Sequence, residues 1–398
     1  MTPPETPAAT PPASALGDQP PRRRPRARDT ILVPILAVLL AFLVGSIVIV
    51  LSSVLTVGYP DLSLPVRAYG SLLQGAGITL DPDVAVNGLV NTVVQAAPLV
   101  LGGLAVGVAF KAGLFNIGAQ GQFLIGALAA AGVGAAVATW PAPVALVVAL
   151  VAGCLAGAAW GFIPGALKAW TGAHEVVTTI MLNTIAASII GWLVTGPLLA
   201  PGFSFSRTGD LGNAVIPVVF GRNLHAGVIL SALAVPAIWF LLWRSTLGFQ
   251  IRAVGANPSA ARYAGMSPTL IITFTMSLAG MLAGMAGAVE ILGITHFMNA
   301  SYGTSVGFDS ITVALLGRTH PVGILLAALL FGAMRAGAGL MQITTGIPVE
   351  IVDVIQAIVL LFIAADVIVR RIFRVRVTTG GFAELQTVTK SYSEGAVH

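Results

Sequence analysis

Charge and cysteine are both scarce in this sequence, and each shortage limits what the chain can be. Only 9% of its 398 residues are charged, whereas 56% are hydrophobic and the mean hydropathy is +0.93. Soluble domains carry about 25% charged residues. A chain of this composition cannot cover a water-facing surface, so we expect a polytopic membrane protein. The single cysteine, Cys154, lies inside an apolar run and excludes a disulfide framework.

Motifs that carry chemistry are also missing. The sequence has no G-x-x-x-x-G-K-[ST] phosphate-binding loop, no G-x-S-x-G elbow and no His, Cys and carboxylate cluster at metal spacing. We therefore expect no catalytic residue, no metal site and no cofactor on this chain. The pI of about 9.8 does not indicate binding to nucleic acid, because the basic residues follow the pattern of membrane topology.

The apolar runs predict an all-α membrane helical bundle of about ten spans. Three regions are expected: a disordered cytoplasmic tail (1–29), a transmembrane domain (30–370) and a second cytoplasmic tail (371–398). The run 308–316 has nine residues, about 14 Å of helix, and therefore predicts a half-helix in a core roughly 30 Å thick. The other expected spans are 31–55, 87–110, 114–137, 143–167, 176–199, 224–243, 269–292, 322–339 and 351–369.

Lysine and arginine indicate the orientation of the spans. With both termini in the cytoplasm, most basic residues fall inside, from Lys111 and Lys168 to the arginine cluster at 370–376. Only three fall outside: Arg67, Arg207 and Arg222. This asymmetry follows the positive-inside rule, so we expect the N-terminus and the C-terminus to be cytoplasmic.

Two polar stretches interrupted by glycine, residues 113–122 and 303–309, lie at the edges of apolar runs in corresponding positions of two halves. Irregular backbone at membrane depth survives only where it lines a cavity or is packed in protein. Paired segments of this kind mark transport sites near the midplane. The amides can bind a polar neutral solute and an aromatic ring can stack on a base, or the amides can only tie helices together. The residues expected along the path are Asn116, Gln120, Gln122, Phe308 and Asp309.

One long polar segment with helix-forming potential, residues 248–267, separates two strongly apolar spans. Asn257 and Pro258 form a helix start signal and Gly265 a stop signal, which predicts a short amphipathic helix on the cytoplasmic face. Such a helix suits a soluble partner, although a solvated loop with positive-inside arginines explains the same composition. We expect Ala261 to face water. The residues expected to meet the partner are Gly255, Asn257, Pro258, Ala260, Ala261, Arg262, Tyr263 and Gly265.

A charged residue also lies within a late span. Arg335 is costly in an apolar environment unless it is paired. Asp353, in the next span, has the opposite charge and comparable apolar surroundings. We therefore expect an ion pair between Arg335 and Asp353.

Three motifs resemble those of permease subunits of ABC importers, in the family that carries branched-chain amino acids, simple sugars and nucleosides. They are FKAGLFNIGAQGQ at 110–122, HEVVTTIMLN at 174–183 and GFDSITVALLGR at 307–318. The resemblance extends from about residue 87 to residue 369 and is most specific to nucleoside-type permeases, the partners of basic-membrane-lipoprotein binding proteins. Sugar-type relatives carry a glycine-aspartate motif in the first broken segment, where this chain has asparagine.

The resemblance implies a permease that is not itself an enzyme and that carries nucleosides or related bases in a bacterial-type cytoplasmic membrane. It implies an ATPase subunit that binds ATP and Mg and docks near 257–264, a second and related permease subunit, and an extracytoplasmic solute-binding lipoprotein. Besides these partners we expect only the lipid bilayer, and no nucleic acid. Two alternatives stay open: a simple-sugar ABC permease and an ion-coupled secondary transporter, for which paired broken helices are also typical. The segment 248–267 distinguishes an ABC permease from a secondary transporter, because a secondary transporter has no partner for it.

Overall fold

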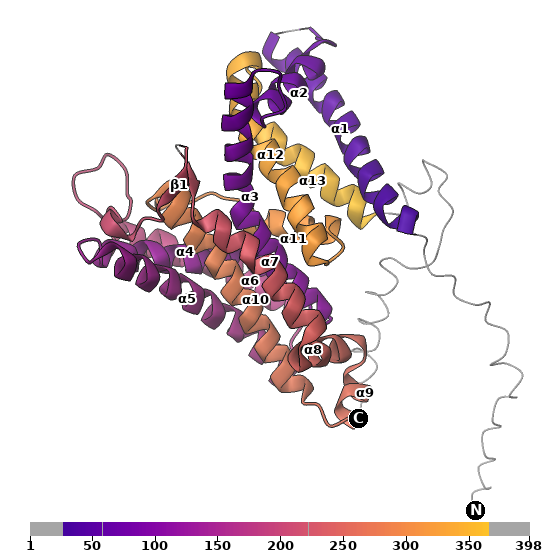
Figure 1. Ribbon diagram of the computed structural model, residues 1–398, viewed down its shortest axis with the longest axis vertical. Coiled ribbons are helices and arrows are strands. Elements are labelled where there is room, and N and C mark those ends of the chain that lie inside the picture. The colour runs from indigo at the N-terminus through magenta and orange to yellow at the C-terminus, as the bar shows by residue number, and fades with distance from the viewer. Residues whose placement is uncertain (1–26, 58, 222, 366–398) are drawn as a thin grey trace, which may run out of the picture.

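The computed structural model describes residues 27–57, 59–221 and 223–365 (Figure 1). The expected tail 371–398 lies outside these residues, and so do residues 1–26 of the expected tail 1–29. Residues 27–29 already belong to the first helix, α1 (Ala27–Val57).

The described chain folds almost entirely into helices. They are α2 (Leu64–Gly75), α3 (Pro82–Lys111), α4 (Ala119–Ala136), α5 (Ala142–Thr171), α6 (Glu175–Thr195), α7 (Gly227–Arg244), α8 (Thr246–Ala256), α9 (Pro258–Tyr263), α10 (Pro268–Glu290), α11 (Val306–Leu316), α12 (Pro321–Thr345) and α13 (Glu350–Ala364). A π-helical turn, η3 (Ile291–Thr295), continues α10, and a 3₁₀ turn, η2 (Gly212–Ala214), precedes a small hairpin. In that hairpin β1 (Val218–Phe220) pairs antiparallel with β2 (Leu224–His225).

Eight of the described helices are long and apolar enough to cross a membrane: α1, α3, α4, α5, α6, α7, α10 and α12. The other two expected crossings correspond to α11, which has 11 residues, and α13, which is described over 15 residues. An all-α multi-pass membrane bundle is therefore confirmed, and the short run at 308–316 does form a helix too short to span. The region 56–86 contains α2, where no helix was predicted.

The helix α3 lies at the centre of the structure. It packs against α7, α10, α11 and α12 and is buried over most of its length. In Figure 1, α4 to α10 lie on one side of it, while α1, α2, α12 and α13 lie on the other. The helices α1, α5 and α6 bury only a minor part of their surface and expose large apolar side chains such as Leu43, Leu155 and Trp192, as lipid-facing helices do.

A close helix contact in the bundle joins α5 to α10 through glycine. A Cβ atom on Gly157 would lie 2.3 Å from the carbonyl oxygen of Gly280, and one on Gly284 would lie 2.5 Å from that of Gly153. No side chain fits at such separations, so the two backbones touch directly. Without a hydrophobic force between helices in lipid, this close packing is what holds them together.

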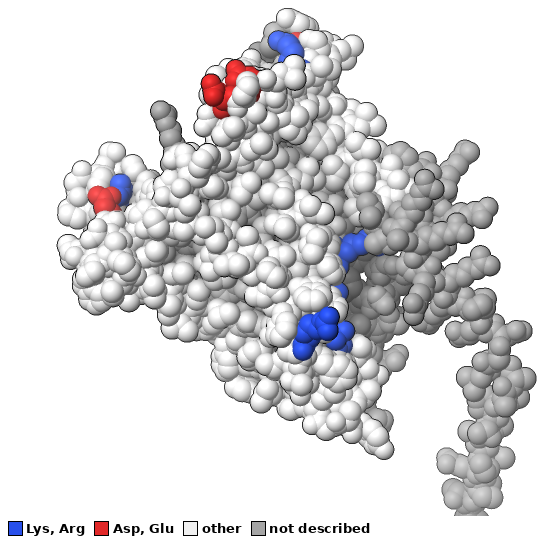
Figure 2. Space-filling model, in the orientation of Figure 1, with Lys and Arg blue, Asp and Glu red and all other residues white. Residues whose placement is uncertain are grey.

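Charged side chains gather at opposite ends of the bundle (Figure 2). Asp81 and Asp83 lie at the start of α3, where the carboxylate of Asp81 caps the helix by accepting from the backbone N–H groups of Asp83 and Val84. Arg244 ends α7 and Arg252 lies in α8, at the other end. On the face shown, the end of the bundle that carries the start of α3 has both acidic and basic side chains, whereas basic side chains stand alone at the end that carries α8.

The glycine contact between α5 and α10 predicts a difference between two identical substitutions. Gly284→Ala forces a backbone shift, whereas a Cβ on Gly339 in α12 meets nothing within 4 Å. In detergent-solubilised protein we expect Gly284→Ala to lower the melting temperature by about 2–4 °C or more. We expect Gly339→Ala to leave it unchanged or to raise it, because alanine favours a helix by about 1 kcal/mol over glycine. Equal melting temperatures for the two variants would contradict the contact.

Candidate functional site

The first broken segment joins α3 to α4 and is held by side-chain amides. The Nδ2 of Asn116 donates to Oε1 of Gln122 at 2.9 Å, and both residues are buried. Asn183, from α6, accepts the backbone N–H of Gly121 at 2.8 Å and donates to the carbonyl of Ile117 at 3.1 Å. These amides satisfy the irregular backbone inside the bundle. Asn116 and Gln122 thus hold the broken segment against the first turn of α4, and neither lines the cleft described below.

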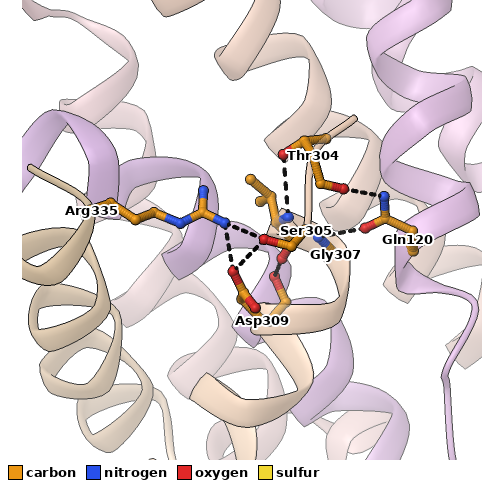
Figure 3. Close-up of polar contacts among 8 residues, drawn as sticks. Gln120, Thr304, Ser305, Gly307, Asp309 and Arg335 are labelled. Carbon is orange, nitrogen blue, oxygen red and sulfur yellow. Dashed lines mark hydrogen bonds and ion pairs between the residues drawn. The ribbon is translucent and has the colours of Figure 1, made fainter. Parts of the chain in front are cut away.

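The second broken segment precedes α11 and is joined to the first by Gln120 (Figure 3). The Nε2 of Gln120 donates to the carbonyl of Thr304 at 2.7 Å, and its Oε1 accepts the backbone N–H of Gly307 at 2.9 Å. A Cβ atom on Gly307 would lie 2.3 Å from the Cα of Gln120, so only glycine permits this approach. The two broken segments meet at one amide.

An ion pair next to this junction connects α11 to α12. The Nη2 of Arg335 donates to Oδ2 of Asp309 at 2.5 Å and to the hydroxyl of Ser305 at 3.0 Å, as Figure 3 shows. The hydroxyl of Ser305 also donates to Asp309, at 2.9 Å. The side chains of Arg335 and Asp309 are 17% and 13% exposed, so the pair is largely shielded from solvent.

The partner predicted for Arg335, Asp353, is wrong. Asp309 occupies that position because α11 packs directly against α12 and presents its first turn to Arg335. Asp353 lies on α13, and the structure gives it no ion pair with Arg335 or with any other described residue.

A cleft of about 610 Å³ opens beside this ion pair. Four helices contribute to its walls: Gln95 comes from α3, Phe308 from α11, Arg335 from α12 and Asp353 from α13, while Ser305 belongs to the second broken segment. Phe308 is 46% exposed, which leaves its side chain available to a ligand. The cleft therefore presents one aromatic ring among polar and charged groups.

Of the five predicted path residues, the structure places only Phe308 on the wall of the cleft. Asp309 forms the ion pair with Arg335, and Gln120 positions the start of α11. Neither Gln95 nor the lining role of Arg335 was predicted from the sequence. The sequence did contain a signal for Gln95, because a polar side chain in the middle of an apolar span is costly and usually has a functional role.

The predicted cytoplasmic segment contains two helices, α8 and α9. Ser245 caps α8 by accepting the N–H of Gly248 at 3.0 Å, and Asn257 caps α9 by accepting the N–H of Ala260 at 3.0 Å. Pro258 occupies the first turn of α9, and Gly265 follows with φ +82°. The start and stop signals in the sequence therefore act as predicted, although the segment also contains α8, which was not predicted.

The expectation that Ala261 faces water is wrong. Ala261 is 3% exposed and belongs to the main hydrophobic core, because α9 lies against the start of α10. Gly255 is also buried, and a Cβ there would lie 2.2 Å from the carbonyl oxygen of Lys111. These two residues position α9. Five of the residues predicted to meet the partner are exposed, and we call them the α9 surface: Asn257, Ala260, Arg262, Tyr263 and Gly265.

Comparisons with known proteins agree with this architecture. Residues 88–364 match the family model described as "Branched-chain amino acid transport system / permease component". The guanosine ABC transporter permease protein NupP of Bacillus subtilis is 42% identical over 70% of this chain and 82% of its own length. The nucleoside ABC transporter permease protein NupB of Lactococcus lactis is 36% identical over 70% of this chain and 79% of its own.

A sugar transporter is also similar. The glucose ABC transporter permease protein TsgB13 of Haloferax volcanii is 34% identical over 82% of this chain and 88% of its own length. No solved structure matches the chain. The family match and these relatives show that the chain belongs to the branched-chain amino acid transport family of ABC permeases, as the motifs at 110–122, 174–183 and 307–318 had indicated.

Proposed function

We propose that this permease carries nucleosides or closely related bases through the cleft beside α11. The observation that carries the proposal is the exposed ring of Phe308 among Gln95, Ser305 and Arg335. An aromatic face stacks on a base, and the surrounding groups hydrogen-bond a polar solute. The volume of about 610 Å³ lies within the usual range for small-molecule sites. Two nucleoside permeases among the relatives support this choice.

Transport of a simple sugar is the second candidate, because TsgB13 aligns over most of this chain. A sugar can hydrogen-bond to the polar groups of the cleft, but it has no aromatic ring to stack on Phe308. Membership of the ABC permease family removes the reason to consider an ion-coupled secondary transporter.

The α9 surface is the proposed docking site of the ATPase, which supplies ATP and Mg. The side chain of Tyr263 is 97% exposed, and an exposed tyrosine beside an arginine is typical of energetic anchors in protein interfaces. Arg262 can pair with an acidic group on the partner. The proposal places α8, α9 and both termini in the cytoplasm and the start of α3 outside. A second permease and a solute-binding lipoprotein complete the assembly.

Uptake measurements test the substrate. In cells that carry the whole transporter, we expect saturable uptake of labelled guanosine, adenosine or uridine, and loss of that uptake when this chain is deleted. Unlabelled ribose and glucose should not compete. Uptake of ribose or glucose with no uptake of any nucleoside would contradict the nucleoside assignment and favour the sugar candidate.

Substitution on the α9 surface tests the coupling. Tyr263→Ala should reduce co-purification of the ATPase and lower uptake by about tenfold or more, since a tyrosine anchor typically contributes about 2 kcal/mol. The abundance of the permease in the membrane should not change, because the side chain packs on nothing in this subunit.

Tyr59→Ala is the matched control, because Tyr59 is an exposed tyrosine next to α2, at the opposite end of the molecule from α9. It should retain both ATPase binding and uptake. Normal ATPase binding and normal uptake by the Tyr263→Ala protein would refute the docking assignment. Ala261 does not serve as a test position, since a charge there disrupts the core.

A further inference from the structure

The carboxylate of Asp353 is the one charged group on the cleft that the described residues leave without a partner. It lies on the wall, on an exposed residue of α13, and forms no hydrogen bond or ion pair with any residue that the structure describes. Glu350, one turn earlier on the same helix, is also exposed but does not line the cleft. The two exposed carboxylates of this helix therefore differ in one respect, which is that Asp353 lines the cleft and Glu350 does not.

The positively charged residue on the cleft, Arg335, is already paired within the protein. The Nη2 of Arg335 donates to both Asp309 and Ser305, and Asp309 neutralises the guanidinium. The pair has no net charge, so Asp353 gives this part of the cleft a net negative charge. A solute bound here gains by donating hydrogen bonds to Asp353, and a phosphate group is repelled.

We propose that Asp353 selects the transported solute by accepting hydrogen bonds from two adjacent donors, one on each carboxylate oxygen. The inference rests on the proposed nucleoside function and names the group that the site reads. A carboxylate accepts two parallel donors, because it has two acceptor oxygens and no donor of its own. The ring of Phe308 holds the base while Asp353 reads its edge or its sugar.

Nucleosides offer such a pair of donors in two places. One is the ribose, whose 2′ and 3′ hydroxyls are adjacent. The other is the edge of guanine, where N1–H and the 2-amino group lie side by side. A solute without the pair leaves a carboxylate oxygen unsatisfied, and a site built for hydrogen bonds rejects such an analogue strongly.

The experiment compares uptake by wild-type, Asp353→Asn and Glu350→Gln proteins in cells carrying the whole transporter. The solutes are guanosine, inosine, 2′-deoxyguanosine and 2′-deoxyinosine. Asparagine is nearly isosteric with aspartate but has only one acceptor oxygen, so one of two adjacent donors faces its amide N–H. The binding protein is the same in all strains, so a change in the ratio of uptake rates reports on the permease.

If the guanine edge is read, Asp353→Asn should lower uptake of guanosine and 2′-deoxyguanosine by about tenfold and spare both inosines. If the ribose is read, it should lower guanosine and inosine by about tenfold and spare both deoxynucleosides. Either pattern supports the proposal, provided that membrane abundance is unchanged and Asp353→Glu retains part of the selectivity. Glu350→Gln should match the wild type throughout.

An equal change, or no change, for all four solutes in Asp353→Asn would overturn the role of Asp353, because 2′-deoxyinosine carries neither pair of donors. That result would leave the proposed function standing, since the wild type would still take up nucleosides. Absence of uptake of every nucleoside by the wild type would instead refute the proposed function itself.

Discussion

The start of α11 depends on the amide of Gln120. A buried backbone group without a hydrogen bond is costly, and here the carbonyl of Thr304 and the N–H of Gly307 each have a partner within the protein. One side chain from α4 supplies both, at 2.7 and 2.9 Å. The short helix α11 can begin inside the bundle because this amide satisfies the backbone groups at its start. The close approach in turn requires that residue 307 be glycine.

The rest of the cleft follows from where α11 begins. Its first turn carries Phe308 into the cleft and Asp309 toward Arg335, which joins α11 to α12. A shielded ion pair adds little net stability because desolvation offsets its attraction, but it defines one arrangement of the two helices. The helix α10 packs on α4 and α5 and is separated from α9 by a short turn ending at Ser267, whose side chain caps α10. Packed elements thus connect the α9 surface with the helix that carries Gln120.

Local signals were sufficient to predict much of this structure from the sequence, and long-range ones were not. The caps at Asn257 and Gly265 and the short length of α11 depend on neighbouring residues and were predicted correctly. The burial of Ala261 depends on α9 lying against α10, which no local pattern reveals. The choice between Asp309 and Asp353 as partner of Arg335 likewise depends on which helix packs next to α12. The helix α2 was missed although Pro65 and apolar residues at Leu64, Ala68 and Leu72 gave it a helical pattern.

Hydrogen–deuterium exchange of residues 303–309 tests the central role of Gln120 most directly. We expect Gln120→Leu to raise the exchange rate of this segment by about tenfold or more, since loss of a buried hydrogen bond costs on the order of 1–3 kcal/mol. Exchange in α10 should stay the same. Gln342→Leu, at an exposed position of α12, serves as the control and should change neither segment. Unchanged protection of 303–309 in the Gln120→Leu protein would show that another contact holds the start of α11.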